Sequence, residues 1–522
     1  MKKKYNLLIV GSGEATRLKP FTTYIPKFLI SLWKKPALIY MLNYWLNLLD
    51  LDNIIITVNP KFKEITKNYI KLFLTNDVFK KIKIIPIEWY YWSADATIKA
   101  INKIWINENL IISWSDILPK ETIKKEIFDK RENIIFLNKE KWCRYNFDNW
   151  NIELVKNNQG NIIWLYYFKK FNFTLKDYVK GEDLIDVIKK SKIKVKGYEL
   201  SFYDFWDYEK WKSTQLELDD NAREFNSLIL IWNFYYKQAL NDKWKDIIKN
   251  EIEAYEEYYK YDLIWDVFPC IYPSLNKESF FIEKVDGKVI RDIYDNLNYN
   301  QQKELVQSFM KTLKILHSKE INLSEKEKYE YCYEEYVGKI KKRINLIKDS
   351  IFYFDSIKKV NWVNILRFEE VMKKVEKWLK DYIKRSKFTI IHWDCTFSNG
   401  LITKDNKIMF IDPRWKFWIK WVIWDKNYDI AKFLYSSLTS YDKFNFWDFY
   451  ISYIDENEIV YNLPKYDIKI EEYLIKNYLN KDTKIILWII WLWLAEYIKN
   501  DILKMNWAYY EWMRQLSLVF KW

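Results

Sequence analysis

Short apolar runs and longer amphipathic stretches alternate through the first 115 residues of the chain. Segments of strand length and helical segments alternate, starting with a strand, at residues 6–10, 37–49, 53–58, 61–74, 82–87, 94–104 and 110–113. Strands that alternate with helices of this length are typical of a parallel sheet with helices on both faces. The pattern predicts an α/β domain over residues 1–214 with a doubly wound, mostly parallel sheet. Loops at the carboxyl ends of its strands are expected to bind the ligand.

A polar stretch interrupts this pattern, and we interpret residues 215–222 as a linker. Beyond it the chain predicts two antiparallel strands, a helix and a further strand at residues 225–231, 233–238, 243–259 and 280–284. Long helical patterns follow at residues 300–316, 329–350, 365–385 and 485–495. The sequence therefore predicts an α+β domain over residues 223–522, with a small lobe to about residue 287 and a helical large lobe from 288 onward.

One later segment carries a dense group of candidate catalytic side chains. A short apolar strand at 389–391 precedes His392 and Asp394, and Asn399 follows five residues after Asp394. Two more apolar runs joined by a polar turn predict a hairpin, which places Asp412 beside Asn399. Phosphoryl transfer needs this arrangement. One carboxylate can orient and deprotonate a hydroxyl, while an amide oxygen and a second carboxylate hold Mg²⁺.

The tryptophan and glycine contents are unusual. The chain has 28 Trp and 8 Gly, although average usage of about 7% Gly would give several dozen. A bulky indole is unsuited to positions that need positive φ or close approach to a phosphate. We hypothesise that many tryptophans come from UGA codons that the source organism reads as glycine; the alternative is a tryptophan-rich surface. Tryptophans in expected turns or beside charged motif residues are Trp33, Trp92, Trp206, Trp393, Trp415 and Trp424.

Charge and cysteine content narrow the choice of partners. We favour codon bias on a solvated surface as the cause of the net charge of +14, and attraction of nucleotides is the alternative. Long Lys/Arg blocks are missing from the sequence, which argues against a nucleic-acid partner. The apolar segment at 485–495 is too short for a membrane span. The four cysteines lack metal spacing and disulfide density, so a reducing cytoplasm is expected.

The first strand leads into a loop of small and cationic residues. Gly11, Gly13 and Thr16 would let backbone N–H groups approach a triphosphate, and Arg17 and Lys27 can neutralise charge on its α-phosphate. A dinucleotide fold is the alternative for a glycine-rich loop, but its further glycine is missing here. With the prolines at positions 20 and 26, the loop resembles the signature of sugar-1-phosphate and choline-phosphate nucleotidyltransferases.

Later blocks continue this resemblance in the family's order, at residues 33–36, 92–96, 113–116 and 202–206. The resemblance implies that Ala94 lies near the base and that Asp116 and Asp204 bind Mg²⁺ against the nucleotide phosphates. A single Asp is more often a turn residue or a helix cap. The combination of blocks implies a nucleotidyltransferase domain.

Two charged residues of the predicted small lobe suggest a nucleotide site. Lys237 lies on its second strand and Glu251 on the helix that follows, with Glu253 as the second choice of partner. A strand lysine paired with a helix glutamate orients the α- and β-phosphates in kinase-like small lobes. Two unrelated surface charges are the alternative.

With Trp taken as Gly, the blocks at 392–399, 411–415 and 424–432 become HGDxxxxN, IDPRG and GDxxYDxAK. They resemble aminoglycoside phosphotransferases and choline kinase-like enzymes. The resemblance implies a bilobal protein-kinase-like domain in which Asp394 is the catalytic base and Asn399 and Asp412 bind metal. The histidine of HxD supports the loop in this family.

The sequence therefore predicts a bifunctional enzyme that uses Mg²⁺, ATP and a second NTP, either CTP or UTP/dTTP. The second domain would phosphorylate a small hydroxylated molecule, and the first would transfer a nucleotidyl group to a phosphorylated substrate. Precursors of cell-surface polysaccharides or lipid head groups are the expected products. An antibiotic-modifying phosphotransferase and a non-catalytic scaffold that binds nucleotides are the alternatives.

Overall fold

The chain divides into two compact units in the computed structural model. Unit 1 comprises Met1–Asp220 and Lys499–Leu503, and unit 2 comprises Asn221–Ile498 and Lys504–Trp522. Helix α7 (Tyr208–Leu218) belongs to unit 1 and includes residues 215–218 of the expected linker. The structure describes residues 3–19, 21–32, 35–88, 93–106, 108–130, 132–139, 143, 145–148, 151–155, 160–173, 179, 181–218, 226–261, 264–414, 422–445, 450–462 and 467–521.

Seven strands form the main sheet of unit 1. In spatial order they are β12 (Val195–Glu199), β8 (Asn133–Leu137), β11 (Ile162–Lys170), β6 (Glu108–Trp114), β1 (Tyr5–Gly11), β4 (Leu51–Val58) and β5 (Ile82–Pro86). Strand β1 is parallel to β4 and β6, β4 is parallel to β5, and β12 is parallel to β8. Strand β11 runs antiparallel to its neighbours in this sheet, β6 and β8. The prediction of a mostly parallel sheet is confirmed.

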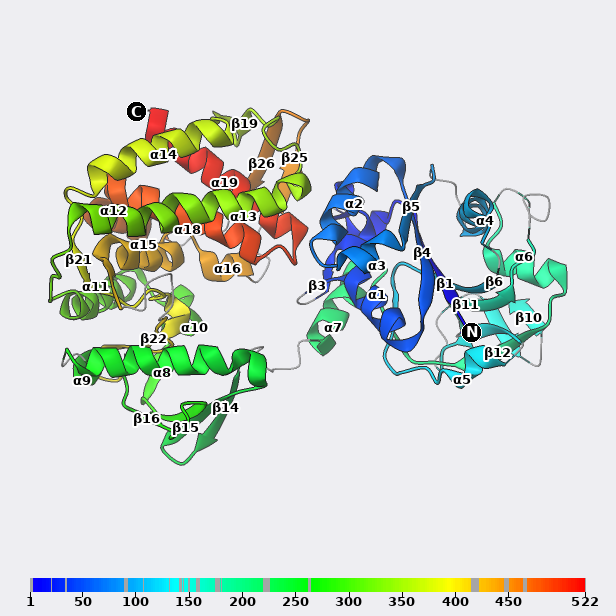
Figure 1. The fold of residues 1–522 in the computed structure, drawn as a ribbon, viewed down its shortest axis with the longest axis horizontal. Coiled ribbons are helices and arrows are strands. Elements are labelled where there is room, and N and C mark those ends of the chain that lie inside the picture. Colours follow the sequence, from blue (N-terminus) through cyan, green and yellow to red (C-terminus); the bar gives the residue numbers. More distant parts are fainter. Residues whose placement is uncertain are drawn as a thin grey trace. The chain divides into compact units, whose positions relative to one another are not determined.

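Helices cover both faces of this sheet. Figure 1 shows α1 (Ala37–Leu48) and α2 (Lys63–Lys71) on one side and α4 (Ser93–Ile104) and α6 (Leu184–Ser191) on the other. Leu7, Leu8 and Ile9 of β1 are all fully buried. Because a strand covered on both faces buries successive side chains, its sequence is a continuous apolar run and not an alternating one.

A small strand pair at the carboxyl end of β6 brings two acidic residues together. β7 (Ile117–Pro119) pairs antiparallel with β13 (Phe202–Asp204), and Asp204 lies opposite Ile117. Asp204 is therefore a neighbour of Asp116, although the two residues are far apart in the sequence.

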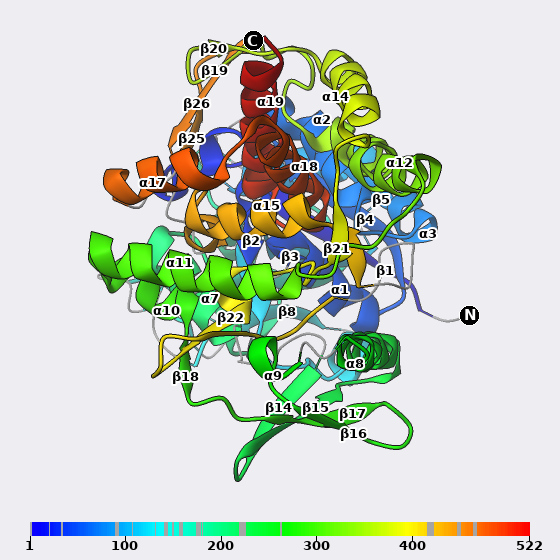
Figure 2. The same cartoon turned by 90° about the vertical axis from the view of Figure 1, so that its left-hand side faces the viewer.

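Unit 2 begins with an antiparallel sheet of four strands, as Figure 2 shows. In spatial order these are β14 (Asn226–Ile231), β15 (Phe234–Ala239), β17 (Ser279–Glu283) and β16 (Ile271–Pro273). Helix α8 (Lys245–Tyr259) packs on this sheet, and Ile248, Ile252 and Tyr255 are buried at helical spacing. The predicted strand pair, helix and third strand are confirmed.

The remainder of unit 2 is mainly helical. Its long helices are α11 (Tyr299–Leu316), α14 (Phe368–Tyr382), α15 (Lys426–Ser437), α18 (Lys481–Tyr497) and α19 (Ile502–Lys521). The helix predicted over 329–350 is instead α12 (Glu325–Tyr333), a π-helical turn and α13 (Lys339–Ile347). Burial of α18 from Ile485 to Ala495 confirms the predicted core helix. Within the described residues, every helix is too short or too polar to cross a membrane.

Two strand pairs frame the segment with the candidate phosphotransfer residues. β21 (Phe388–Ile390) pairs with β24 (Ile423–Asp425), and β22 (Gly400–Thr403) forms a hairpin with β23 (Ile408–Phe410). The Ile411 N–H donates to the Asn399 carbonyl at 3.0 Å. The hairpin therefore returns the chain to Asn399 just before Asp412, in agreement with the sequence pattern.

Candidate functional site

The loop after β1 differs in part from the predicted phosphate cradle. The Gly11 N–H donates to Thr57 Oγ1 at 3.0 Å, and a Cβ at Gly11 would overlap the Phe28 ring. Gly11 thus serves packing, and its N–H is engaged within the protein. Gly13 is exposed with open space around it, and Thr16 is exposed at the start of a 3-10 turn.

Two cations of unit 1 lie beside predicted site residues. The Lys27 ammonium forms an ion pair with Asp116 Oδ2. The Arg17 guanidinium lies over the Trp206 ring, with its central carbon 3.9 Å from the ring centroid. Asp116 is buried, and its other oxygen, Oδ1, has no hydrogen-bond partner among the residues that the structure describes. A buried carboxylate oxygen without a donor is suited to a metal ion.

Asp204 completes this acidic pair. Burial and the nearby Asp116 carboxylate raise its pKa, and the Lys210 ammonium, 2.5 Å from Asp204 Oδ2, opposes that shift. Lys210 was not predicted, because no signal in the sequence links a lysine of α7 to this strand. Within the described residues, groups of three or more His, Cys, Asp and Glu side chains that could hold a metal are absent. Two carboxylates plus nucleotide phosphates are a donor set that Mg²⁺ accepts.

Ala94 lies in the segment that opens helix α4. It is fully buried at the start of α4 and packs in the apolar core of unit 1. The proximity of Ala94 to a nucleotide base stays a prediction. The predicted positions Pro20, Trp33, Lys34 and Trp92 lie outside the described residues.

A buried lysine joins the two parts of unit 2. The Lys237 ammonium lies 2.7 Å from both oxygens of Glu251 and 2.6 Å from Asp412 Oδ1. These residues come from β15, from α8 and from the chain after β23. Burial by itself lowers the pKa of Lys237, but Asp412 and Glu251 outweigh burial and hold that pKa above its ordinary value. Lys237 is therefore charged, and its partner on α8 is Glu251 and not Glu253.

Asp394 is buried between two cations. Arg414 Nη2 lies 2.9 Å from its Oδ2, and Lys432 Nζ lies 2.9 Å from its Oδ1. The Asn399 side-chain amide donates to the Asp394 carbonyl at 2.9 Å, which orients Asn399 toward the same loop. Burial raises the pKa of Asp394, yet Arg414 and Lys432 together hold it well below its usual range. Asp394 is ionised throughout the physiological range.

Asp429 holds the loop that carries Asp394. Its carboxylate accepts from the backbone N–H groups of His392 at 2.8 Å and Trp393 at 2.9 Å, and it contacts His317 Nε2 at 3.1 Å. His392 Nδ1 accepts from the Asp394 N–H, so its Nε2 carries the proton that is donated to the Ile411 carbonyl. Burial lowers the pKa of His392 and keeps the ring neutral. His392 therefore supports the loop.

Tryptophan occupies several backbone positions with positive φ. Trp393 has φ 70° and is buried, with its ring centroid 4.9 Å from that of Trp424. Trp105 follows α4 with φ 56°, and Trp232 has φ 58° in the two-residue turn between β14 and β15. Trp362 has φ 62° beside Asn361 in the turn between β19 (Lys359–Val360) and β20 (Val363–Asn364). Helix ends and tight hairpin turns with positive φ are where glycine is strongly preferred.

These positions only partly match the tryptophans singled out from the sequence. Trp424, singled out beside Asp425, lies in β24 and has no positive φ. Trp206 also has no positive φ. Trp33, Trp92 and Trp415 lie outside the described residues.

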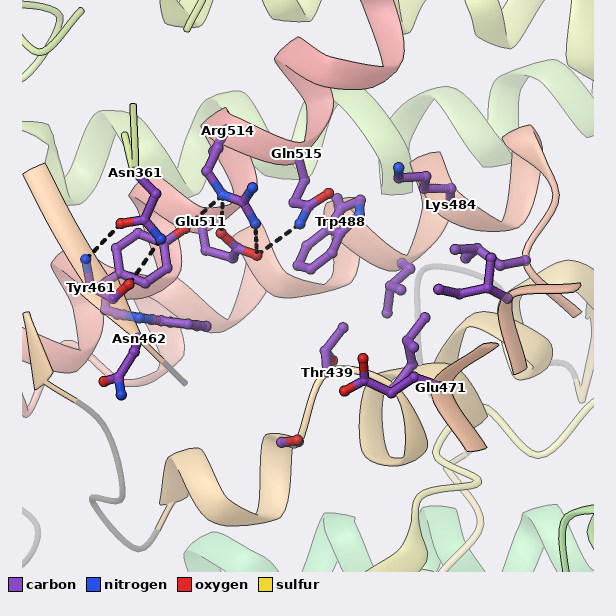
Figure 3. Close-up of a pocket in the computed structure, with 16 residues that line it drawn as sticks. Asn361, Thr439, Tyr461, Asn462, Glu471, Lys484, Trp488, Glu511, Arg514 and Gln515 are labelled. Carbon is purple, nitrogen blue, oxygen red and sulfur yellow. Dashed lines mark hydrogen bonds and ion pairs between the residues drawn. The ribbon is translucent and has the colours of Figure 1, made fainter. Parts of the chain in front are cut away.

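Unit 2 also contains a cavity of about 510 Å³ that the sequence did not reveal. Figure 3 shows Arg514 and Glu511 on its wall, joined at 2.8 Å, and Lys484 also lines it. The Tyr461 N–H donates to Asn361 Oδ1 at 2.8 Å on the same wall. Its described lining includes none of the predicted site residues, so it is separate from the chemistry around Asp394.

No protein-family model matches the chain, and no curated protein does. Among solved structures it is similar to a UDP-glucose pyrophosphorylase complexed with UDP-glucose, at 14% identity and a TM-score of 0.35 over 42% of this chain and 100% of the other. It is also similar to a CTP:phosphocholine cytidylyltransferase from Streptococcus pneumoniae, at 18% identity and a TM-score of 0.34 over 42% and 100%. A UDP-glucose pyrophosphorylase from Acinetobacter baumannii matches at 11% identity and a TM-score of 0.34 over 42% and 95%. These values are too low to indicate an activity for this chain.

Proposed function

We propose that unit 2 is a phosphotransferase that moves the γ-phosphoryl group of ATP to a hydroxyl of a small molecule. The observation that carries this proposal is the Lys237 ammonium, held between Glu251 and Asp412. A strand lysine, a helix glutamate and a carboxylate after a hairpin are the parts that orient nucleotide phosphates in kinase-like sites. Asp394 and Asn399 lie on the loop that leads into the same hairpin.

In this mechanism Asp394 orients the acceptor hydroxyl and takes its proton, which then passes to solvent. The hydroxyl oxygen forms a bond to the γ-phosphorus, and the bond from that phosphorus to the bridging oxygen of ADP breaks. Lys237 contacts the α- and β-phosphates. Asn399 and Asp412 would hold Mg²⁺, which neutralises phosphate charge when bound. Because the pKa of Asp394 is low despite its burial, Asp394 contributes orientation more than basicity.

Phosphorylation assays on the whole protein test this proposal. The protein is given Mg-ATP and a panel of hydroxylated acceptors, and ADP and phosphorylated product are measured. Asp394→Asn should lower kcat by about 10²- to 10⁴-fold, the usual contribution of a positioned acid–base group. Asp405→Asn, in the exposed turn of the hairpin, is the matched control. Full activity of Asp394→Asn on every acceptor would exclude this role for Asp394.

We further propose that unit 1 transfers a nucleotidyl group from an NTP to a phosphorylated substrate. An oxygen of the substrate phosphate attacks the α-phosphorus, and the bond to the leaving pyrophosphate breaks. Asp116 and Asp204 would hold Mg²⁺, and Arg17 and Lys27 would stabilise the developing charge. The support is the neighbouring pair of carboxylates, buried Asp116 and half-buried Asp204, with a cation beside each.

Pyrophosphate release with CTP, UTP and dTTP tests the second activity. We expect Asp116→Asn to abolish pyrophosphate release and to leave phosphorylation by unit 2 unchanged. If the two steps are consecutive, a labelled phosphate added by unit 2 appears in the nucleotide-linked product. A phosphorylated product that unit 1 does not accept would overturn the consecutive order. Nucleotide binding without turnover at either unit would favour a scaffold.

A further inference from the structure

Two positive charges meet one negative charge at Asp394. Arg414 and Lys432 each lie 2.9 Å from one of its oxygens. Among the described residues, Asp394 is the only acidic side chain within ion-pair distance of either cation. The ring of Tyr435 lies 5.0 Å from the Lys432 ammonium and adds no full negative charge. Arg414 and Lys432 thus carry one positive charge more than the single acidic side chain within ion-pair distance of them.

The other acidic groups nearby are already engaged. The Asp429 carboxylate accepts from two backbone N–H groups of the loop, and Asp412 is paired with Lys237. Glu335 is paired with Lys339 at 2.6 Å. Burial lowers the pKa of Lys339 to about 8 despite that ion pair, and Arg343 and Arg414 add to the lowering, as expected near further cations. None of these acidic groups lies within ion-pair distance of Arg414 or Lys432.

The side chains of Arg414 and Lys432 differ in their exposure to solvent. The side chain of Lys432 is 13% exposed and that of Arg414 is 53% exposed. An acceptor hydroxyl that approaches Asp394 must share or displace one of these ion pairs, since both carboxylate oxygens are occupied. Arg414 is the cation that can turn toward an incoming molecule, and a guanidinium matches carboxylate and phosphate groups with two parallel hydrogen bonds.

We propose that the acceptor of unit 2 is an anionic hydroxylated molecule, whose carboxylate or phosphate is held by Arg414 and Lys432 while its hydroxyl meets Asp394. This inference rests on the phosphotransferase function proposed above. A cationic acceptor, such as an amino sugar or a quaternary ammonium alcohol, would place like charges beside Arg414 and Lys432 and bind poorly. The site thus selects for acidic acceptors and against basic ones.

Matched acceptors test the charge preference on the full chain. The pairs are a hexuronic acid and its parent hexose, glycerate and glycerol, a sugar phosphate and the free sugar, and an amino sugar as the cationic member. We expect the kcat/KM of at least one acidic member to exceed that of its neutral partner by about 10-fold or more, because charge-assisted hydrogen bonds of this kind are the strong ones. The carboxylate and phosphate pairs distinguish which anionic group the site takes. Higher kcat/KM for neutral or cationic members in every pair overturns the inference.

Two variants separate acceptor binding from an effect on the transferring phosphoryl group. We expect Arg414→Gln and Lys432→Gln to raise the KM of the acidic acceptor about 10-fold and to leave the KM for ATP unchanged. In both variants the kcat/KM of the acidic acceptor should no longer exceed that of its neutral partner. Lys380→Gln, on the exposed side of α14, is the charge-matched control and should leave the preference intact. An equal fall of kcat for acidic and neutral acceptors in Arg414→Gln and Lys432→Gln would instead assign both cations to the phosphoryl group and overturn the inference.

The acceptor assays distinguish a wrong acceptor class from a wrong proposed function. Phosphorylation of neutral or cationic acceptors that depends on Asp394 keeps the phosphotransferase and overturns the anionic acceptor. Turnover with none of the acceptors overturns both. Circular dichroism melts of the variants exclude unfolding as the cause of a lost preference.

Discussion

Replacing Trp232 by glycine and, separately, by alanine tests whether tryptophan occupies glycine positions in this chain. Trp232 has φ 58° in the turn between β14 and β15, and its side chain is 92% exposed. Both replacements remove the indole, and at this exposure little packing is lost. Only glycine also removes the Cβ atom, which is what makes positive φ unfavourable.

The expected difference follows from two opposing terms. Positive φ costs a residue with a Cβ about 1–2 kcal/mol. At an ordinary helix or strand position, glycine is instead less stable than alanine by about 0.5–1 kcal/mol. We therefore expect Trp232→Gly to be more stable than Trp232→Ala by about 1 kcal/mol, the reverse of the usual order. Trp362 and Trp105, which are 76% and 91% exposed, provide two independent repeats.

Calorimetric melting of the unit that carries each site measures the difference, because about 1 kcal/mol shifts Tm by roughly 2–4 °C in a domain of this size. Lys380→Gly and Lys380→Ala on α14 are the control pair and should show the usual order, with alanine more stable. Alanine variants as stable as the glycine variants at all three tryptophans would refute the reasoning. Mass spectrometry of peptides from the source organism then shows whether glycine is the natural residue there.

Further predictions concern buried charges. Burial raises the pKa of Asp425 to about 6, so its folded form binds a proton more tightly than its unfolded form. Its contribution to stability should therefore fall by about 2 kcal/mol as pH rises from 4 to 7, and Asp425→Asn should remove this dependence in urea titrations. Lys237→Met should abolish phosphorylation and destabilise unit 2 by about 3–5 kcal/mol, because Glu251 and Asp412 lose their buried cation. Adding Glu251→Gln to that variant should restore part of the stability but not the activity. Lys210→Ala should lower pyrophosphate release by unit 1 at unchanged phosphorylation by unit 2; equal rates would remove Lys210 from the site.

Local patterns in the sequence were enough to predict several elements. The alternation of strands and helices indicated the sheet of unit 1, since strands covered on both faces are continuous apolar runs. The hairpin that returns Asp412 to Asn399 was also predictable, because a polar turn between two short apolar runs has few other structures. In the hairpin the determining contacts lie close in sequence.

Other features depend on contacts between distant segments. Arg414 and Lys432 meet Asp394 only because the hairpin and the first turns of α15 converge on one loop. Asp204 meets Asp116 because β13 pairs with β7. Burial of Ala94 was missed for the same reason, since a small residue at a helix start suits a ligand site and a packed core equally well.

The sequence by itself determined the order and type of the elements and the presence of an Asp, Asn, Asp set suited to phosphoryl transfer. It also showed an excess of tryptophan over glycine, but not which tryptophans are strained. Tertiary structure decided the partner of Lys237, the two cations on Asp394 and the positive φ of Trp105, Trp232, Trp362 and Trp393. Which charges pair, and which residues take positive φ, depends on how segments pack in three dimensions. The spacing of residues along the chain does not determine that packing.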